Sequence, residues 1–214
     1  MKKSFLSLIL VLAVFTGVVA QNATYTKAME SAIARVKYTA PTPDLQQAAG
    51  QFEQIASAET AEWLPNYWAA YTYILLAFKE TDVTKKDAML DKAADFYKKV
   101  AQQQADNDET MVLAAQLAAS RLAVDPENRW QQYVPEFEDA MAKAKQKNPE
   151  NPRIFALQGQ SLFYTPEQYG GGKAVACPVL KQAAEKFATF KPASTIHPNW
   201  GMDTNQYLLS QCGQ

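Results

Sequence analysis

Histidine and cysteine, which often serve as catalytic bases, nucleophiles and metal ligands, are scarce in this chain. It has one histidine and two cysteines among 214 residues, and neither the CxxC nor the HExxH spacing occurs. A zinc site needs three or four such ligands, and a serine or cysteine nucleophile needs a base beside it. The one histidine, His197, stands in a turn before Pro198. We therefore expect no metal site, no cofactor and no enzymatic activity.

An excess of positive charge is also missing. The net charge is −1, and removal of an N-terminal segment that carries Lys2 and Lys3 would leave 19 basic against 22 acidic residues, a net charge of −3. A weakly acidic chain has no overall attraction for nucleic acid or for an anionic lipid surface. We expect neither as a partner.

No apolar run long enough to cross a membrane occurs beyond the first twenty residues, which differ from the rest of the chain. Two lysines precede an apolar run from Phe5 to Phe15, and small residues follow up to Ala20. This is the three-part pattern of a secretory signal peptide, and it predicts cleavage after Ala20. The apolar stretch is shorter than the ~20 residues of a membrane-spanning helix, and no cysteine follows the cleavage point for lipid attachment. We predict a signal peptide at 1–20 and a mature protein that is periplasmic or secreted.

Cys177 and Cys212 are the only cysteines. In an oxidising compartment an even number of cysteines favours disulfides, but the bond requires Cα atoms within about 7 Å. The sequence leaves two alternatives, one disulfide or two free thiols.

Helical periodicity fills the chain after the signal, and no segment alternates as a strand does. Prolines and short polar turns separate the periodic segments. Pro135 stands inside one of them and predicts either a helix start near Tyr133 or a bend. The expected helices cover residues 22–36, 45–58, 66–78, 85–104, 109–123, 129–146 and 202–212, with two more between residues 148 and 192.

The segment 148–192 is the clearest pair of antiparallel helices. Three glycines at 170–172 precede Lys173 and invite a phosphate-loop interpretation. That motif requires Ser or Thr after its lysine and a strand before the loop, whereas Ala174 follows here and no strand precedes. We interpret the glycines as an elbow with positive φ between two helices.

A small residue stands four positions before an aromatic residue in Ala48–Phe52, Ala93–Tyr97 and Ala183–Phe187, and together with Phe137 the aromatics recur about every 40 to 50 residues. Self-similarity in this range is typical of helical solenoids. With prolines between the units, the pattern resembles degenerate tetratricopeptide repeats over about residues 44–212, although no full consensus repeat is present.

The resemblance implies an all-α fold of stacked antiparallel helical pairs, with about 8–10 helices in a single domain over 21–214. The glycine elbow looks like that of tetratricopeptide-like extracytoplasmic proteins of bacteria, some of which serve transporters as periplasmic partners.

Aromatic residues concentrate between Trp63 and Tyr73. Tyr67 and Tyr71 lie one helical turn apart, on one stripe. These rings either form core or line a recognition groove, since Tyr and Trp are frequent at binding hot spots. The candidate binding residues are Trp63, Tyr67, Trp68, Tyr71, Gln158, Gln160, Tyr164 and Tyr169.

Two functions fit these features. The first is a non-catalytic scaffold that binds a protein or peptide partner in its concave groove. The alternative is a small-molecule-binding accessory of an extracytoplasmic transport system. A scaffold requires an open groove, whereas a small-molecule binder requires an enclosed apolar pocket near Tyr67 and Tyr71.

Overall fold

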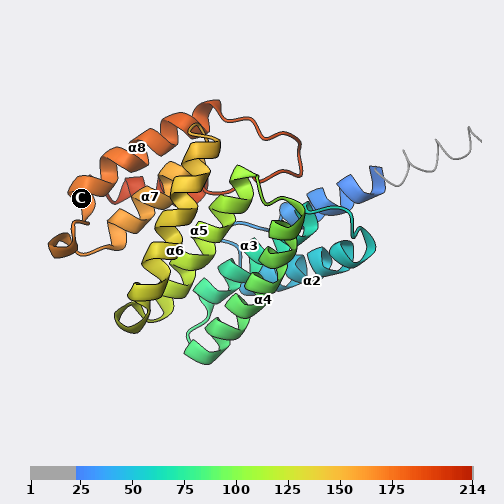
Figure 1. Ribbon diagram of the computed structural model, residues 1–214. Helices are drawn as coiled ribbons and strands as arrows, with labels where there is room; N and C mark the ends of the chain where they lie inside the picture. Colours follow the sequence, from blue (N-terminus) through green and yellow to red (C-terminus); the bar gives the residue numbers. More distant parts are fainter. Residues whose placement is uncertain (1–22, 214) are drawn as a thin grey trace, which may run out of the picture.

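The computed structural model describes residues 23–213, and every regular element in that part of the chain is helical (Figure 1). The all-α prediction is confirmed. The predicted signal peptide lies outside the described residues. After a first helix over residues 23–33, the elements are α2 (Thr42–Ala58), α3 (Leu64–Lys79), α4 (Val83–Gln103), α5 (Asp108–Val124), α6 (Pro126–Lys147), α7 (Pro152–Tyr164), the short 3-10 helix η1 (Glu167–Tyr169), α8 (Lys173–Thr189) and α9 (Met202–Ser210).

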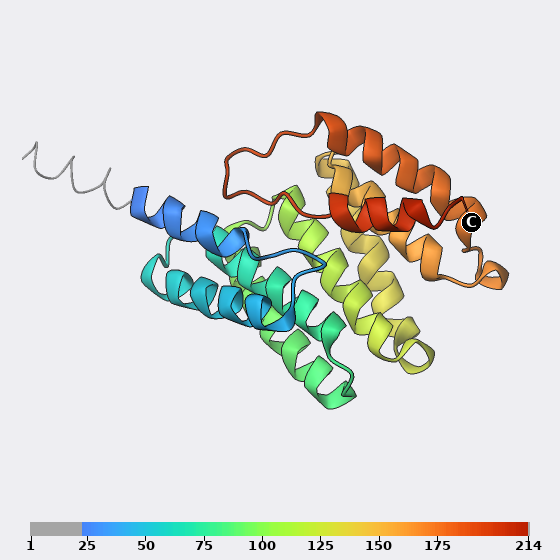
Figure 2. The ribbon, with the colours of Figure 1, turned by 180° about the vertical axis from the view of Figure 1, so that it is seen from behind.

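The helices pack as a stack of adjacent pairs. Helix α3 pairs with α4, α5 with α6 and α7 with α8, while α3, α5 and α7 also contact one another in series. Helix α2 packs on α3 at one end, and α9 packs against α7 and α8 at the other (Figures 1 and 2). The predicted stack of helical pairs is therefore present. No helix within residues 23–213 combines the length and apolar character that a membrane crossing requires.

Helix α3 is the central element of this stack. Its sequence is apolar on nearly every face, which predicts burial on several sides, and almost all of its residues are buried. Pro65 occupies the first turn, where a missing N–H costs no helical hydrogen bond. The indole of Trp68 is fully buried and stacks on the ring of Phe52 from α2, with centroids 6.2 Å apart.

Helix α6 begins earlier than the sequence suggested. Asp125 caps it and Pro126 occupies its first turn, so the helix is under way well before Pro135, which lies in its interior. The predicted start near Tyr133 is wrong, because the capping residue and the N-terminal proline together favour the earlier start.

The elbow between α7 and α8 has the backbone that its glycines suggested. Gly170 and Gly172 have φ of 83° and 96°. Beyond the elbow the two helices are in close contact, since a Cβ on Gly159 would lie 2.6 Å from Leu180 Cδ2. The glycine at this position lets the backbone of α7 approach α8.

A long connection and a disulfide fix α9 in place. Residues 190–201, here called the strap, lead from α8 back across α3, where Trp68 Nε1 donates a hydrogen bond of 2.8 Å to the Ile196 carbonyl (Figure 2). Cys177 and Cys212 form a disulfide with Cα atoms 5.9 Å apart. This bond joins α8 to the residues that follow α9.

Candidate functional site

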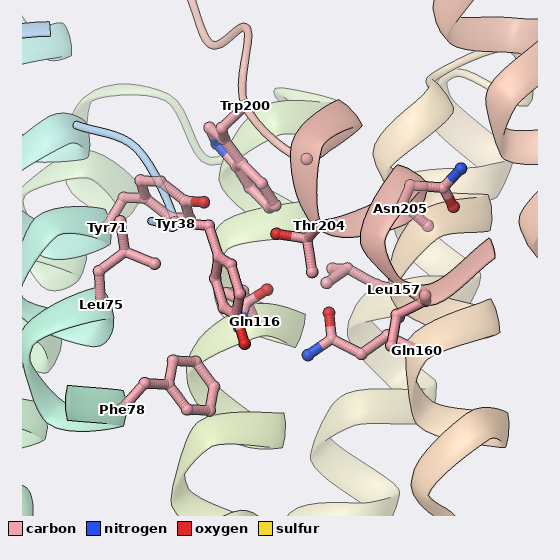
Figure 3. Close-up of a pocket in the computed structure, with 13 residues that line it drawn as sticks. Tyr38, Tyr71, Leu75, Phe78, Gln116, Leu157, Gln160, Trp200, Thr204 and Asn205 are labelled. Carbon is pink, nitrogen blue, oxygen red and sulfur yellow. The ribbon is translucent and has the colours of Figure 1, made fainter. Parts of the chain in front are cut away.

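A narrow cleft lies between α3, α5, α7 and α9, and Figure 3 shows the residues around it. Four helices, the end of the strap and the loop between residues 33 and 42 contribute its walls. The space that these side chains enclose is about 20 Å³. The lining residues are Tyr38, Tyr71, Leu75, Phe78, Gln116, Ala156, Leu157, Gln160, Trp200, Gly201, Thr204, Asn205 and Leu208.

Helical spacing places these side chains on the cleft. Tyr71, Leu75 and Phe78 are four and three residues apart, so they lie along one face of α3. Thr204 and Leu208 have the same relation on α9. The cleft is therefore the place where the apolar stripes of separate helices meet without filling the space between them.

Trp200 forms one end of the cleft. Its indole stacks on the ring of Tyr71, with centroids 4.4 Å apart and planes inclined by 19°. Its Nε1 donates a hydrogen bond of 2.9 Å to the hydroxyl of Tyr67. Gly201 follows with φ of 104°, a left-handed conformation that turns the chain into α9. Only 8% of Trp200 is exposed, so its orientation is fixed.

A buried charged network holds Trp200 from behind. Arg153 is fully buried, and its Nε donates a hydrogen bond of 2.8 Å to Glu109 Oε2, while its Nη2 contacts Glu109 Oε1. Asn151 Nδ2 donates to Glu109 Oε1 over 2.7 Å. The Tyr67 hydroxyl completes the network by a 3.4 Å contact to Glu109 Oε2. The Arg153 guanidinium also lies 5.7 Å from the Trp200 ring.

Burial dominates the electrostatics of this network. It raises the pKa of the Glu109 carboxyl, although the Arg153 guanidinium acts in the opposite direction. Burial likewise raises the pKa of Tyr67 well above its ordinary value, and the nearby Glu109 adds to that effect. Tyr71 has a raised pKa for the same reason, with a further contribution from Asp203. Both phenols therefore stay protonated at neutral pH.

Polar side chains line the opposite part of the cleft. Figure 3 shows Gln116, Gln160 and Thr204 around the same space as Phe78. Asn205 is 1% exposed and donates through Nδ2 to the Leu180 carbonyl over 3.0 Å. Its Oδ1 has no hydrogen-bond partner among the described residues. The cleft thus combines flat aromatic surfaces with hydrogen-bonding groups.

Two exposed tyrosines, Tyr207 and Tyr164, lie on the helices that contribute to the cleft. Tyr207 on α9 is 51% exposed, and its ring centroid lies 6.4 Å from that of Tyr38. Tyr164, at the end of α7, is 63% exposed. Its pKa is raised by partial burial and, to a smaller extent, by Tyr38 and Tyr207.

The structure distributes the predicted binding residues over several environments. Of those on α3 and just before it, Tyr71 lines the cleft, Tyr67 and Trp68 are fully buried, and Trp63 is half-buried with its ring edge against His197. Gln160 lines the cleft, whereas Tyr164 is exposed and is not among the lining residues. Gln158 and Tyr169 are exposed and are not among the lining residues.

Sequence reasoning missed several lining residues. Leu75 and Phe78 follow Tyr71 at helical spacing and could have been found from it. Tyr38 and Trp200 could not, because they lie in loops without periodicity and are brought together only by the fold.

The cleft has no nitrogen or sulfur side chains of the kinds that commonly ligate transition metals. Its lining contains no histidine, cysteine or methionine. His197 is directed elsewhere, with Nδ1 2.7 Å from Ser194 Oγ. Within residues 23–213 no three histidine, cysteine or acidic residues are grouped as a metal site would require.

The fold has a counterpart among solved structures. No protein-family model matches the sequence, and no curated protein matches it. The HusA haemophore from Porphyromonas gingivalis has a similar structure, with a TM-score of 0.76 and 32% sequence identity; the alignment covers 88% of this chain and 92% of that one. The chain belongs to the family of this haemophore. A helical-repeat fold is compatible with that relationship, whereas the resemblance to tetratricopeptide repeats is not confirmed.

Proposed function

We propose that this protein binds haem in the cleft between α3, α7 and α9 and carries it without chemical change. A haemophore is by name a haem-capturing protein, and HusA shares 32% of its residues with this chain over most of both lengths. The observation in the structure that carries the proposal is the stacked pair of Tyr71 and Trp200 at the end of a cleft with polar groups opposite.

The lining matches the chemistry of a porphyrin. The macrocycle is flat, conjugated and apolar on both faces, and its carboxylates lie on one edge. Aromatic side chains favour stacked or edge-on contacts with such a ring, and Tyr71, Phe78 and Trp200 offer them. The amide of Gln160 and the hydroxyl of Thr204 supply hydrogen-bond donors for the carboxylates. An apolar cleft with a few polar groups is the usual form of a small-molecule site.

Contacts to the faces of the porphyrin, more than coordination of its iron, provide the affinity in this proposal. Tyrosine oxygen is the established iron ligand type in the lining, where Tyr38 and Tyr71 are the tyrosines. Burial raises the pKa of the Tyr71 phenol, which disfavours the phenolate form that ligates iron. Packing and desolvation of the macrocycle therefore supply most of the affinity.

The shape of the site favours a small molecule over a protein partner. An open groove was expected for a scaffold and an enclosed apolar pocket for a small-molecule binder. The cleft at Tyr71 is narrow and has walls on several sides. We therefore favour the second of the two functions, a small-molecule-binding accessory that works outside the cytoplasm.

Titration of the mature protein with hemin, followed by the Soret band, tests this function. Tyr71→Ala removes one side of the aromatic stack and should weaken binding by about tenfold or more, since such a ring contact contributes about 0.5–1.5 kcal/mol beyond its buried area. Trp130→Ala on α6 is the matched control, because Trp130 is 55% exposed and outside the lining. Absence of a Soret shift in the unaltered protein, or an equal loss in both variants, contradicts the proposal.

We also propose export, with removal of residues 1–20 and a single domain over 21–214. The disulfide between Cys177 and Cys212 supports this proposal, because such bonds persist in oxidising compartments. The intact mass of the protein recovered from the extracytoplasmic fraction should correspond to a chain that begins at Gln21. A mass that includes the first twenty residues contradicts it.

A further inference from the structure

The ring of Tyr38 lies inside the cleft that we propose for haem. Figure 3 shows it pointing between Phe78 and Gln116, although Tyr38 comes from the loop between residues 33 and 42 and not from a helix. With the ring there, about 20 Å³ of space remains. Sites for ligands of this size typically hold roughly 300–1,000 Å³. The cleft must therefore open before a porphyrin can enter, and Tyr38 occupies its centre.

The loop is built so that Tyr38 can move without the helices. Val36 and Ala40 are each 8% exposed and anchor the loop in the core. Between them Lys37 and Thr39 are exposed and Tyr38 is half-buried. Withdrawal of the ring would require displacement of these three residues and loss of the 3.0 Å hydrogen bond from the Ala40 N–H to the Lys37 carbonyl.

The ring packs against the hydrophobic core, and few contacts to α9 add to that packing. The Tyr38 backbone N–H donates a hydrogen bond of 3.1 Å to Asp203 Oδ2, and the Tyr38 ring has a tilted contact with Tyr207. Both partners are exposed residues of α9. Water can replace an exposed hydrogen bond, so breaking it costs little free energy. The contacts to α9 thus add little to the stability of the closed position.

We propose that Tyr38 is a plug that closes the ligand-free cleft and leaves it, with residues 37–39, when a flat ligand enters. The hydrogen bond from the Tyr38 N–H to Asp203 stabilises the closed position. The identity of the ligand rests on the proposed function, whereas the opening of the cleft does not.

Two measurements on Tyr38→Ala test the plug. The first is stopped-flow association with hemin. A minor open state is typically populated at about 0.1–10%, so removal of the plug should raise the association rate by about tenfold or more. The second is fluorescence of the dye 8-anilinonaphthalene-1-sulfonate without hemin, which should rise because the apolar walls become accessible. Asp203→Ala should change both in the same direction but less.

Trp130→Ala on α6 is the control, since it removes an exposed aromatic side chain that does not line the cleft and should match the unaltered protein in both measurements. Circular dichroism establishes that each variant is folded. Enhanced dye binding by Tyr38→Ala supports the plug even if no variant binds hemin, a result that would refute the proposed ligand alone. Unchanged dye binding overturns the plug, as does an unchanged association rate with weaker hemin affinity, because Tyr38 would then be a group that holds the ligand.

Discussion

The two sides of the cleft are built differently. Behind Trp200, the charged pair of Glu109 and Arg153 is buried and hydrogen-bonded to Tyr67 and Asn151. On the other side, Tyr38 packs against the core, and its contacts to α9 are one hydrogen bond to an exposed carboxylate and one contact to an exposed ring. One side resists rearrangement because each displaced group would leave a buried partner unsatisfied. On the other side, water can replace the exposed hydrogen bond to Asp203.

The two sides of the cleft are therefore suited to different roles. A preorganised wall lowers the entropy lost on binding, whereas access to a closed cleft requires some part of it to move.

The largest effect is expected from Arg153→Ala. The substitution leaves Glu109 buried without its cation, and breaking such a pair costs about 3–5 kcal/mol. Urea denaturation measures the loss. The double variant Glu109→Leu with Arg153→Met should lose less, because it removes both charges and restores apolar volume. A single variant of unchanged stability would show that the wall does not depend on this pair.

Removal of the disulfide should cause the next largest loss of stability. The bond between Cys177 and Cys212 spans a sequence separation of 35 residues, for which loop closure in the unfolded chain predicts about 3–4 kcal/mol. The doubly substituted Cys177→Ser, Cys212→Ser protein should unfold at lower urea concentration. Reduced unaltered protein should match it. If reductant leaves the transition where it was, the bond does not stabilise the end of α9.

A smaller loss is expected where α7 meets α8. Gly159→Ala places a Cβ against Leu180, and overpacking of this kind costs about 1–3 kcal/mol. Gly50→Ala in α2 is the matched control, because no atom lies within 4 Å of the added Cβ. There the alanine should stabilise the helix by about 0.5–1 kcal/mol. The same sign for both substitutions would contradict close packing behind the cleft.

The smallest effect concerns pH and the strap. Burial lowers the pKa of His197, so the unfolded chain takes up this proton at a higher pH than the folded protein does. The contribution of the neutral ring is complete above about pH 6.5 and is lost as the pH falls from there toward the folded value. His197→Gln should therefore lose less stability than the unaltered protein between pH 7.5 and 5.5, as urea denaturation measures. An equal loss in both contradicts the shift.

Much of the architecture follows from local sequence. The apolar run of α3 has no polar face and must be buried on several sides, and Gly170 and Gly172 allow the positive φ that the elbow needs. Pro135 shows the limit of such reasoning, since the capping at Asp125 outweighed the proline. Periodicity identifies helices because side chains three or four residues apart lie on the same face of a helix.

The site depended on contacts that no local pattern encodes. Tyr67 and Tyr71 share one stripe of α3, yet their side chains have different surroundings. The Tyr67 hydroxyl joins the buried network and accepts a hydrogen bond from Trp200, whereas Tyr71 stacks on Trp200 and lines the cleft. Trp200 belongs to the strap, whereas Tyr38 belongs to the loop between residues 33 and 42. Which of the candidate residues bind a ligand stays a prediction. The sequence by itself determined the helices and their pairing, while the tertiary structure alone decided where they leave a cleft, because that depends on how side chains distant in the chain fill shared space.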